Sequence, residues 1–212
     1  MIKNTSELVL ELHEYANPNT KIQRLIKDKK LFKIKQGLYE TNININPFYL
    51  TNIIYGPSYI SFQTALSYYG MIPERVYAIT SATLNKHKSK EYKNEFGTYL
   101  YNDVPSNAFP YGILRIEENE YCYFIATKEK ALCDMLYEYS PVFSMKEIEK
   151  LLFDDLRIDE EKFNSLDMNF LIELASLYKN TNHKYLIKYV RSKKLWWIAF
   201  WFKKWIDITL RI

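Results

Sequence analysis

The clearest pattern of apolar and polar positions lies in residues 59–83, YISFQTALSYYGMIPERVYAITSAT. Apolar residues recur there at helical spacing and predict an amphipathic helix, through Tyr59, Phe62, Leu66 and Tyr69. Gly70 can take the left-handed conformation that ends a helix, and Pro73 prevents the helix from resuming. Residues 76–80 then predict a mostly buried strand, because β-branched and aromatic residues are frequent there. We expect this stretch to be a packing unit of the core, without a catalytic group.

The chain before this stretch predicts two short helices. Residues 5–15 are expected to form an amphipathic helix that Thr5 or Ser6 caps. After the turn ANPN, residues 21–30 predict a second helix, for which Thr20 is the expected cap. Both helices carry apolar residues on one face, so they can share a small core.

A basic hairpin follows these helices. The sequence LFKIKQGLYETN predicts two short strands around Gln36 and Gly37. Residues 21–35 carry seven Lys or Arg against only Asp28. A helix pair, then a basic helix, then a β-hairpin is the layout of a winged helix–turn–helix, in which the last helix enters the major groove. The spacing leaves room for at most a turn in place of the middle helix of that motif.

The basic residues of this region are candidates for DNA contact. The outward face of the second helix is expected to hold Lys21, Gln23, Arg24 and Lys27. Lys33 and Lys35 are expected on the wing, where they can neutralise phosphates. The alternative is a solvated lysine face, which surface helices often have.

Residues 84–101 predict a second basic hairpin. Its first part is polar and carries Lys86, Lys88 and Lys90, and a strand follows through Phe96, Tyr99 and Tyr101. The lysines of this exposed loop are expected either to contact an anion or a partner, or only to make the loop soluble.

The later pattern becomes helical. Two strand-like pieces, GILRIEE and EYCYFIAT, precede a helix that Thr127 caps. Ser144 and Glu147 predict a capping box, and Asp159 begins another helix. Further helices are expected after these, ending in the C-terminal tail.

These patterns together predict an α+β fold. We expect an N-terminal winged helix-turn-helix-like head over residues 1–50, followed by a body over residues 51–212. The body is expected to be mixed α/β to about residue 140 and helical after it.

Composition and missing motifs argue against catalysis. The 212 residues carry a net charge of +4 and only five glycines, which excludes the usual glycine-rich phosphate loops. Three scattered histidines do not predict a metal site. Cys133 is expected to be a buried side chain rather than a nucleophile. We therefore expect no cofactor, no metal and no enzymatic activity. A cytoplasmic location is expected, because the N-terminal apolar run contains acids, unlike a signal peptide.

The C-terminal residues 195–212 are unusually rich in tryptophan and phenylalanine. The run LWWIAFWF is too short to span a bilayer. A helix through residues 195–205 would be apolar nearly all round, with lysines at its edges. It would dock on the body or on a partner protein, or lie in a membrane interface.

The stretch over residues 59–83 resembles the core signature of AbiEi-type antitoxins, which belong to type IV (abortive-infection) toxin–antitoxin systems. In that family a helix of the form YIS–ALSYYGLIPE leads into a strand ending V–ITS–T. The passage ATKEKALCDMLY, residues 126–137, resembles the family's A-x-x-EKALLDLLY. LIKDKKLFKIKQGLYET resembles its wing. The resemblance covers about residues 20–140, and the short head and the aromatic tail depart from the family pattern.

The resemblance implies a two-part role. The head of such antitoxins binds the promoter of its own operon as an autorepressor, and the body counteracts a nucleotidyltransferase-like toxin, without a stable complex being implied. By motif position, the residues that read or flank bases would be Lys21, Arg24 and Lys27, and those that hold phosphates would be Lys33, Lys35 and Gln36. Lys86, Lys88 and Lys90 are candidates for the body's function. The alternative is a protein-interaction module without DNA function, which docks through its aromatic C-terminal helix.

Overall fold

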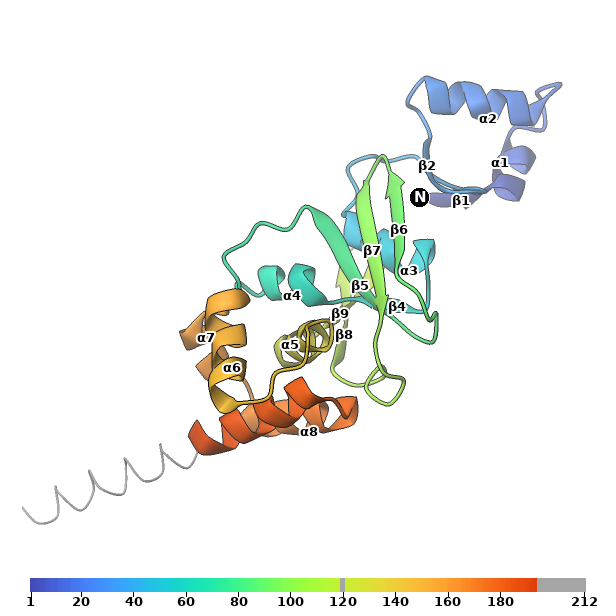
Figure 1. The fold of residues 1–212 in the computed structure, drawn as a ribbon. Helices are drawn as coiled ribbons and strands as arrows, with labels where there is room; N and C mark the ends of the chain where they lie inside the picture. Colours follow the sequence, from blue (N-terminus) through green and yellow to red (C-terminus); the bar gives the residue numbers. More distant parts are fainter. Residues whose placement is uncertain (119–120, 194–212) are drawn as a thin grey trace, which may run out of the picture.

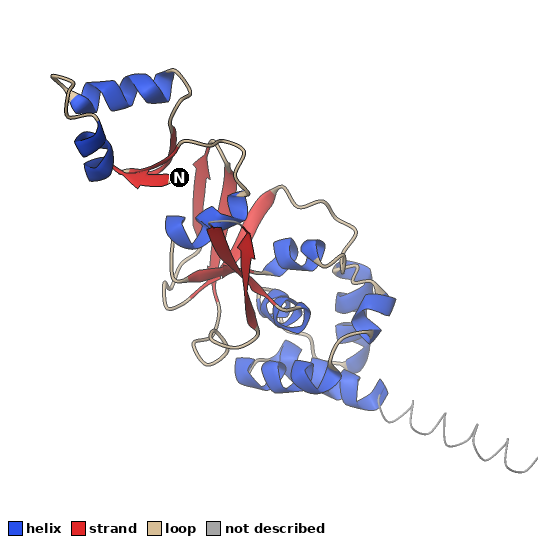
Figure 2. Cartoon of the chain, turned by 180° about the vertical axis from the view of Figure 1, so that it is seen from behind, coloured by secondary structure: helices blue, strands red, loops and turns tan. Residues whose placement is uncertain are grey.

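The computed structural model describes residues 1–118 and 121–193. The protein has a mixed α+β fold with two β-sheets (Figure 1). A small head contains a three-stranded sheet, and a larger body contains a six-stranded sheet. Figures 1 and 2 show the head and the helical part at opposite ends, with the six-stranded sheet between them. The aromatic tail over residues 195–212 lies outside the described residues.

The head folds around a small apolar core. Its elements are β1 (Ile2–Asn4), α1 (Thr5–Glu11), α2 (Pro18–Lys27), β2 (Phe32–Lys35) and β3 (Leu38–Glu40). The strands form an antiparallel sheet in the order β1-β3-β2. The buried core of the head consists of Leu8, Ile22, Leu31 and Tyr39. The hairpin is confirmed, and β1 is a strand that the sequence did not predict.

The caps of both head helices differ from prediction, although α1 begins at Thr5 as expected and ends early, at Glu11, while α2 begins at Pro18, before the predicted residue 21. The side chain of Asn4 accepts from the backbone N–H of Glu7, and Glu7 bonds back to Asn4, which completes a capping box. Asn17 likewise accepts from Thr20, and Pro18 occupies the first turn of α2. Neither Thr5, Ser6 nor Thr20 is therefore the cap. Asparagine followed by proline starts α2, so ANPN is not a free turn.

A short connection leads into the body sheet. It contains η1 (Pro47–Leu50) and α3 (Thr51–Ile54), and α3 packs on β4 and β9. The sheet has the order β6-β7-β5-β4-β9-β8, in which the pairs β4–β9 and β5–β7 are parallel. Its strands are β4 (Ser58–Ile60), β5 (Ala78–Thr83), β6 (Lys90–Asn94), β7 (Gly97–Asp103), β8 (Ile113–Glu118) and β9 (Tyr121–Ala126).

The predicted helix beginning at Tyr59 is wrong at its start. Tyr59 lies in β4, where it pairs with Ala82 of β5, and the helix α4 covers only Phe62–Tyr68. Pairing with β5 therefore outweighs the helical spacing of the apolar residues. The predicted end is confirmed, because Gly70 has a φ of 65° and its N–H donates to the Ser67 carbonyl.

Two further details of the strands differ from prediction. β5 begins at Ala78, and Tyr77 before it is exposed. The polar residues 84–89 form the connection from β5 to β6 rather than the tip of a hairpin. The hairpin of β6 and β7 turns instead at Glu95 and Phe96, because β6 already begins at Lys90.

Helices cover the end of the sheet away from the head. The central helix is α5 (Lys128–Tyr137), which packs on α4, α8 and β9. Its cap is Thr127, as predicted. The other helical segments are α6 (Met145–Lys150), the π-helical turn η2 (Leu151–Asp155), α7 (Glu160–Asn164), α8 (Met168–Tyr178) and a helix over residues 181–193. Among the described residues, no helix is long and apolar enough to cross a membrane.

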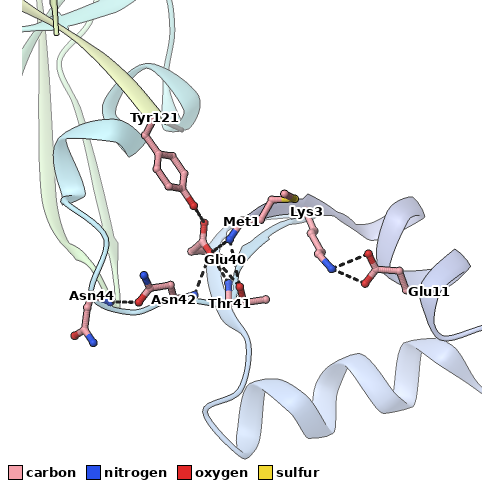
Figure 3. A network of polar contacts seen from close by, with 8 residues as sticks. All are labelled: Met1, Lys3, Glu11, Glu40, Thr41, Asn42, Asn44 and Tyr121. Atoms are coloured by element: carbon pink, nitrogen blue, oxygen red, sulfur yellow. Dashed lines mark hydrogen bonds and ion pairs between the residues drawn. The ribbon is translucent and has the colours of Figure 1, made fainter. Parts of the chain in front are cut away.

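The head contacts the body through strand edges and one carboxylate. The rings of Phe32 and Phe96 pack edge to face, with 6.2 Å between centroids. Glu40, which has no exposed surface, accepts a hydrogen bond from the hydroxyl of Tyr121 at 3.2 Å. The same carboxylate accepts from the amino group of Met1 at 2.5 Å and from the N–H of Thr41 (Figure 3). Glu40 therefore links the N-terminal amino group and the end of β3 to β9 of the body.

Candidate nucleic-acid interface

The outward face of α2 carries the predicted polar residues in an accessible arrangement. Gln23, Arg24 and Lys27 are exposed, while Ile22 is 2% exposed and anchors the helix in the head core. Within the described residues, neither Arg24 nor Lys27 forms an ion pair. Two unpaired cations one turn apart can meet an anion without first breaking a salt bridge.

Lys21 differs from its neighbours on this helix. Its Nζ lies 4.4 Å from the centroid of the Tyr15 ring, and its side chain is half-buried. This cation–π contact holds the ammonium over the segment between α1 and α2. Lys21 is therefore positioned by the head itself, whereas Arg24 and Lys27 are free to reach outward.

The wing residues have different surroundings. Lys33 Nζ donates to Gln36 Oε1 at 3.1 Å, and both side chains are exposed. Lys35 instead donates to the carbonyls of Ile53 and Ile54, at 2.5 and 3.3 Å. The ammonium of Lys35 thus caps the C-terminal end of α3, where cations are favoured by the helix dipole. Lys35 supports the junction of head and body rather than an open phosphate site.

The basic residues after β5 lie close to the same junction. Lys86 Nζ lies 4.9 Å from the centroid of the Tyr55 ring, directly after α3, and Lys90 Nζ lies 5.8 Å from that of Tyr92. Lys88 is exposed. Asp103 fixes the connection, because its carboxylate accepts from the N–H of His87 at 2.5 Å. The structure therefore brings Lys35 and Lys86 to one end of α3, which the sequence alone did not predict.

A buried polar network in the body was also missed by the sequence analysis. Lys130 and Asp134 lie one turn apart on α5 with no exposed side-chain surface, and their charged atoms are 3.2 Å apart. Lys130 Nζ also donates to the carbonyl of Ala108 at 2.8 Å and to the hydroxyl of Tyr178 at 2.6 Å. The i, i+4 spacing was visible in KEKALCD, but it is indistinguishable from that of an exposed pair.

Asp134 joins this network to two more elements. Its Oδ2 accepts from Tyr59 of β4 at 3.0 Å and from Ser61 at 2.6 Å. Its Oδ1 accepts a short hydrogen bond from Tyr178 of α8. Burial, followed by the charge of Asp134, raises the pKa of the hydroxyls of Tyr59 and Tyr178 well above the ordinary value. Because its charged members have no exposed surface, the network holds elements together and offers no access to a substrate.

Cys133 and His183 are also buried beside this network. Burial raises the pKa of the Cys133 thiol, so the thiol stays protonated and is not an activated nucleophile. Burial lowers the pKa of His183 to about 3, and its Nε2 bonds to the carbonyl of Cys133 at 2.9 Å. Among the described residues, no group of three His, Cys, Asp or Glu side chains could hold a metal ion.

Comparison of the chain with models of known protein families and with curated proteins found no match. The functional reading of the α2 face therefore depends on its geometry and charge, and on the sequence motifs described above.

Proposed function

We propose that this protein is an AbiEi-type antitoxin that binds the promoter of its own operon and counteracts a nucleotidyltransferase-like toxin. The observation that carries the DNA-binding part is the exposed, unpaired cationic face of α2. The motifs over residues 59–83 and 126–137 support the antitoxin part.

In this proposal α2 approaches the major groove through its outward face. Gln23 and Arg24 are suited to base edges, since amide and guanidinium groups make bidentate contacts there. Lys27, at the C-terminal end of α2, would contact the phosphate backbone, as would Lys33 and Gln36 on the wing. The head differs from a full winged helix–turn–helix in having two helices rather than three, and its sheet includes a third strand, β1. A head of this size would depend on α2 for most of its contacts.

The body would act on the toxin's effect separately from DNA binding. Lys86, Lys88 and Lys90 remain the proposed surface for this role, because Lys88 and Lys90 are exposed on and beside the connection between β5 and β6. A cytoplasmic location is part of this proposal, since both DNA and toxin would be met there.

Gel-shift titration with the DNA upstream of the gene tests the role of α2. The variant Arg24→Ala/Lys27→Ala is expected to bind the DNA more weakly. Its affinity should also fall less steeply with salt, because the slope of log affinity against log salt concentration decreases by about one for each lost phosphate contact. Lys146→Ala/Lys150→Ala is the matched control, because it removes two exposed cations from α6 of the body. Equal binding by the two double variants would exclude α2 as the DNA-contacting helix.

Co-expression with the neighbouring nucleotidyltransferase-like protein tests the second role. The Arg24→Ala/Lys27→Ala variant is expected to relieve growth arrest as well as the unaltered chain does, while it fails to repress a promoter reporter. Loss of both activities together would contradict a division of labour between head and body.

A further inference from the structure

A second cationic site lies at the end of the molecule opposite the head. An open pocket of about 660 Å³ is lined by the end of α8, the helix over residues 181–193, and the connection that follows α5. We call it the basic pocket, and its cationic members are Lys179, Lys184, Lys188 and Arg191. Neither the head nor the surface around Lys88 contributes to it.

The cations of the basic pocket have no acidic counterpart. No Asp or Glu lines the pocket, and within the described residues none of its four cations forms an ion pair. Lys184, Lys188 and Arg191 recur at i, i+4 and i+7, so they share one face of the helix. Lys179 adds a charge from the left-handed residue that ends α8, with a φ of 53°. Repulsion among like charges at such spacing is relieved when an anion binds between them.

One wall of the pocket is apolar and well fixed. Tyr139, Pro141 and Ile187 contribute to it. The amide of Asn182 donates to the carbonyls of Tyr139 and Ser140, at 3.1 and 3.2 Å, which holds this connection in place. The floor includes His183, whose pKa is lowered to about 3 by burial. The histidine is therefore neutral near pH 7, and the lysines and the arginine supply all of the positive charge.

We propose that the basic pocket binds a nucleoside di- or triphosphate. Its volume falls in the range of small-molecule sites, about 300 to 1,000 Å³. The cations on the helix span about 10 Å along its axis, from the rise of 1.5 Å per residue. Such a short span fits a compact polyphosphate, whereas a nucleic-acid strand needs cations along an extended track. The apolar wall beside Tyr139 can accept the base. This inference does not depend on DNA binding by α2.

Calorimetric titration of the full chain with ATP, and separately with inorganic pyrophosphate, tests the site at low ionic strength. ATP is expected to bind more tightly than pyrophosphate, because only ATP can use the apolar wall. Lys184→Gln/Lys188→Gln is expected to weaken ATP binding by about tenfold to a hundredfold, because a hydrogen bond to a charged group changes a dissociation constant by about that factor.

The matched control is Lys146→Gln/Lys150→Gln, which removes two exposed lysines at the same spacing on α6. This control should leave ATP affinity unchanged, and circular dichroism should show both variants folded. Equal weakening in the two variants, or no heat of binding with ATP, would overturn the proposal. A single-stranded oligonucleotide provides a further test. If it binds more tightly than ATP, and Lys184→Gln/Lys188→Gln abolishes this binding, the ligand of the basic pocket is a nucleic acid and the proposal is overturned.

Discussion

The buried pair of Lys130 and Asp134 allows a prediction in which a second substitution restores part of the stability that the first one removes. Replacing Asp134 by Leu leaves the Lys130 ammonium buried with the Ala108 carbonyl and the Tyr178 hydroxyl as hydrogen-bond partners and no counter-ion. Removing one member of a buried ion pair costs about 3 to 5 kcal/mol. This is a large part of a total stability of about 5 to 15 kcal/mol. We expect Asp134→Leu to be strongly destabilised, or unfolded, at room temperature.

The same substitution also removes the acceptor of three buried hydroxyls, those of Tyr59, Ser61 and Tyr178. Tyr59 and Ser61 both donate to Asp134 Oδ2, and each unsatisfied group costs about 1 to 3 kcal/mol. Lys130→Met should cost less, about 3 kcal/mol, because the Asp134 carboxylate keeps its three hydroxyl donors and the Ala108 carbonyl still accepts from the N–H of Tyr111.

The decisive comparison is the double variant Lys130→Met/Asp134→Leu. Adding Lys130→Met to Asp134→Leu removes the unpaired buried charge, so the double variant is expected to be more stable than Asp134→Leu by about 2 kcal/mol. Urea denaturation of the full chain, followed by circular dichroism, measures all three free energies of unfolding. A double variant less stable than Asp134→Leu would refute the reasoning.

A surface ion pair provides the control for this cycle. Arg157 and Glu74 are 2.8 Å apart, but their side chains are 62% and 43% exposed. Glu74→Gln should therefore change the free energy of unfolding by at most about 1 kcal/mol. A cost for Asp134→Leu as small as this would show that the buried pair is solvated.

Two further predictions concern the head. Asn17→Ala removes the side-chain cap of α2 and should destabilise the head by about 1 kcal/mol. Compared with the unaltered chain, the variant should show faster amide hydrogen exchange in α2 and a smaller change in α5. An equal change of exchange in the two helices would contradict the role of the cap. Glu40→Gln should remove a part of the stability that depends on pH. Burial raises the pKa of Glu40, but the hydrogen bonds from Met1, Asn42 and Thr41 outweigh burial and lower the pKa below its usual value of 4.5. The ionised carboxylate therefore stabilises the fold near neutral pH, and this stabilisation is lost as the pH falls through the lowered pKa. Identical acid-denaturation curves for Glu40→Gln and the unaltered chain would contradict this.

Local signals in the sequence predicted several boundaries correctly. Thr127 caps α5, Asp159 caps α7, and Gly70 ends the turn after α4, since each depends on a few neighbouring residues. Side chains with two competing uses were harder to assign. Tyr59 fits helical spacing as well as a strand, and only pairing with Ala82, distant in the sequence, decides between them.

The candidate sites show the same limit. The exposed face of α2 followed from helical spacing, and Gln23, Arg24 and Lys27 lie where that spacing places them. Lys35 was expected to face phosphate, but its ammonium bonds to Ile53 and Ile54, which the strand pattern of the head does not reveal. Burial of Lys130 depends on α4 and α8 packing around α5, and no local pattern encodes it.

The partners of Asp134 also have a consequence for the order of folding. Tyr59 precedes Asp134 by 75 positions and Tyr178 follows it by 44. A ribosome that has completed α5 has not yet supplied α8, so the nascent helix carries Lys130 without the hydroxyl of Tyr178. Contacts so distant along the chain close slowly. We therefore expect α5 to remain loosely packed during synthesis, and the body to become cooperative only when α8 has emerged.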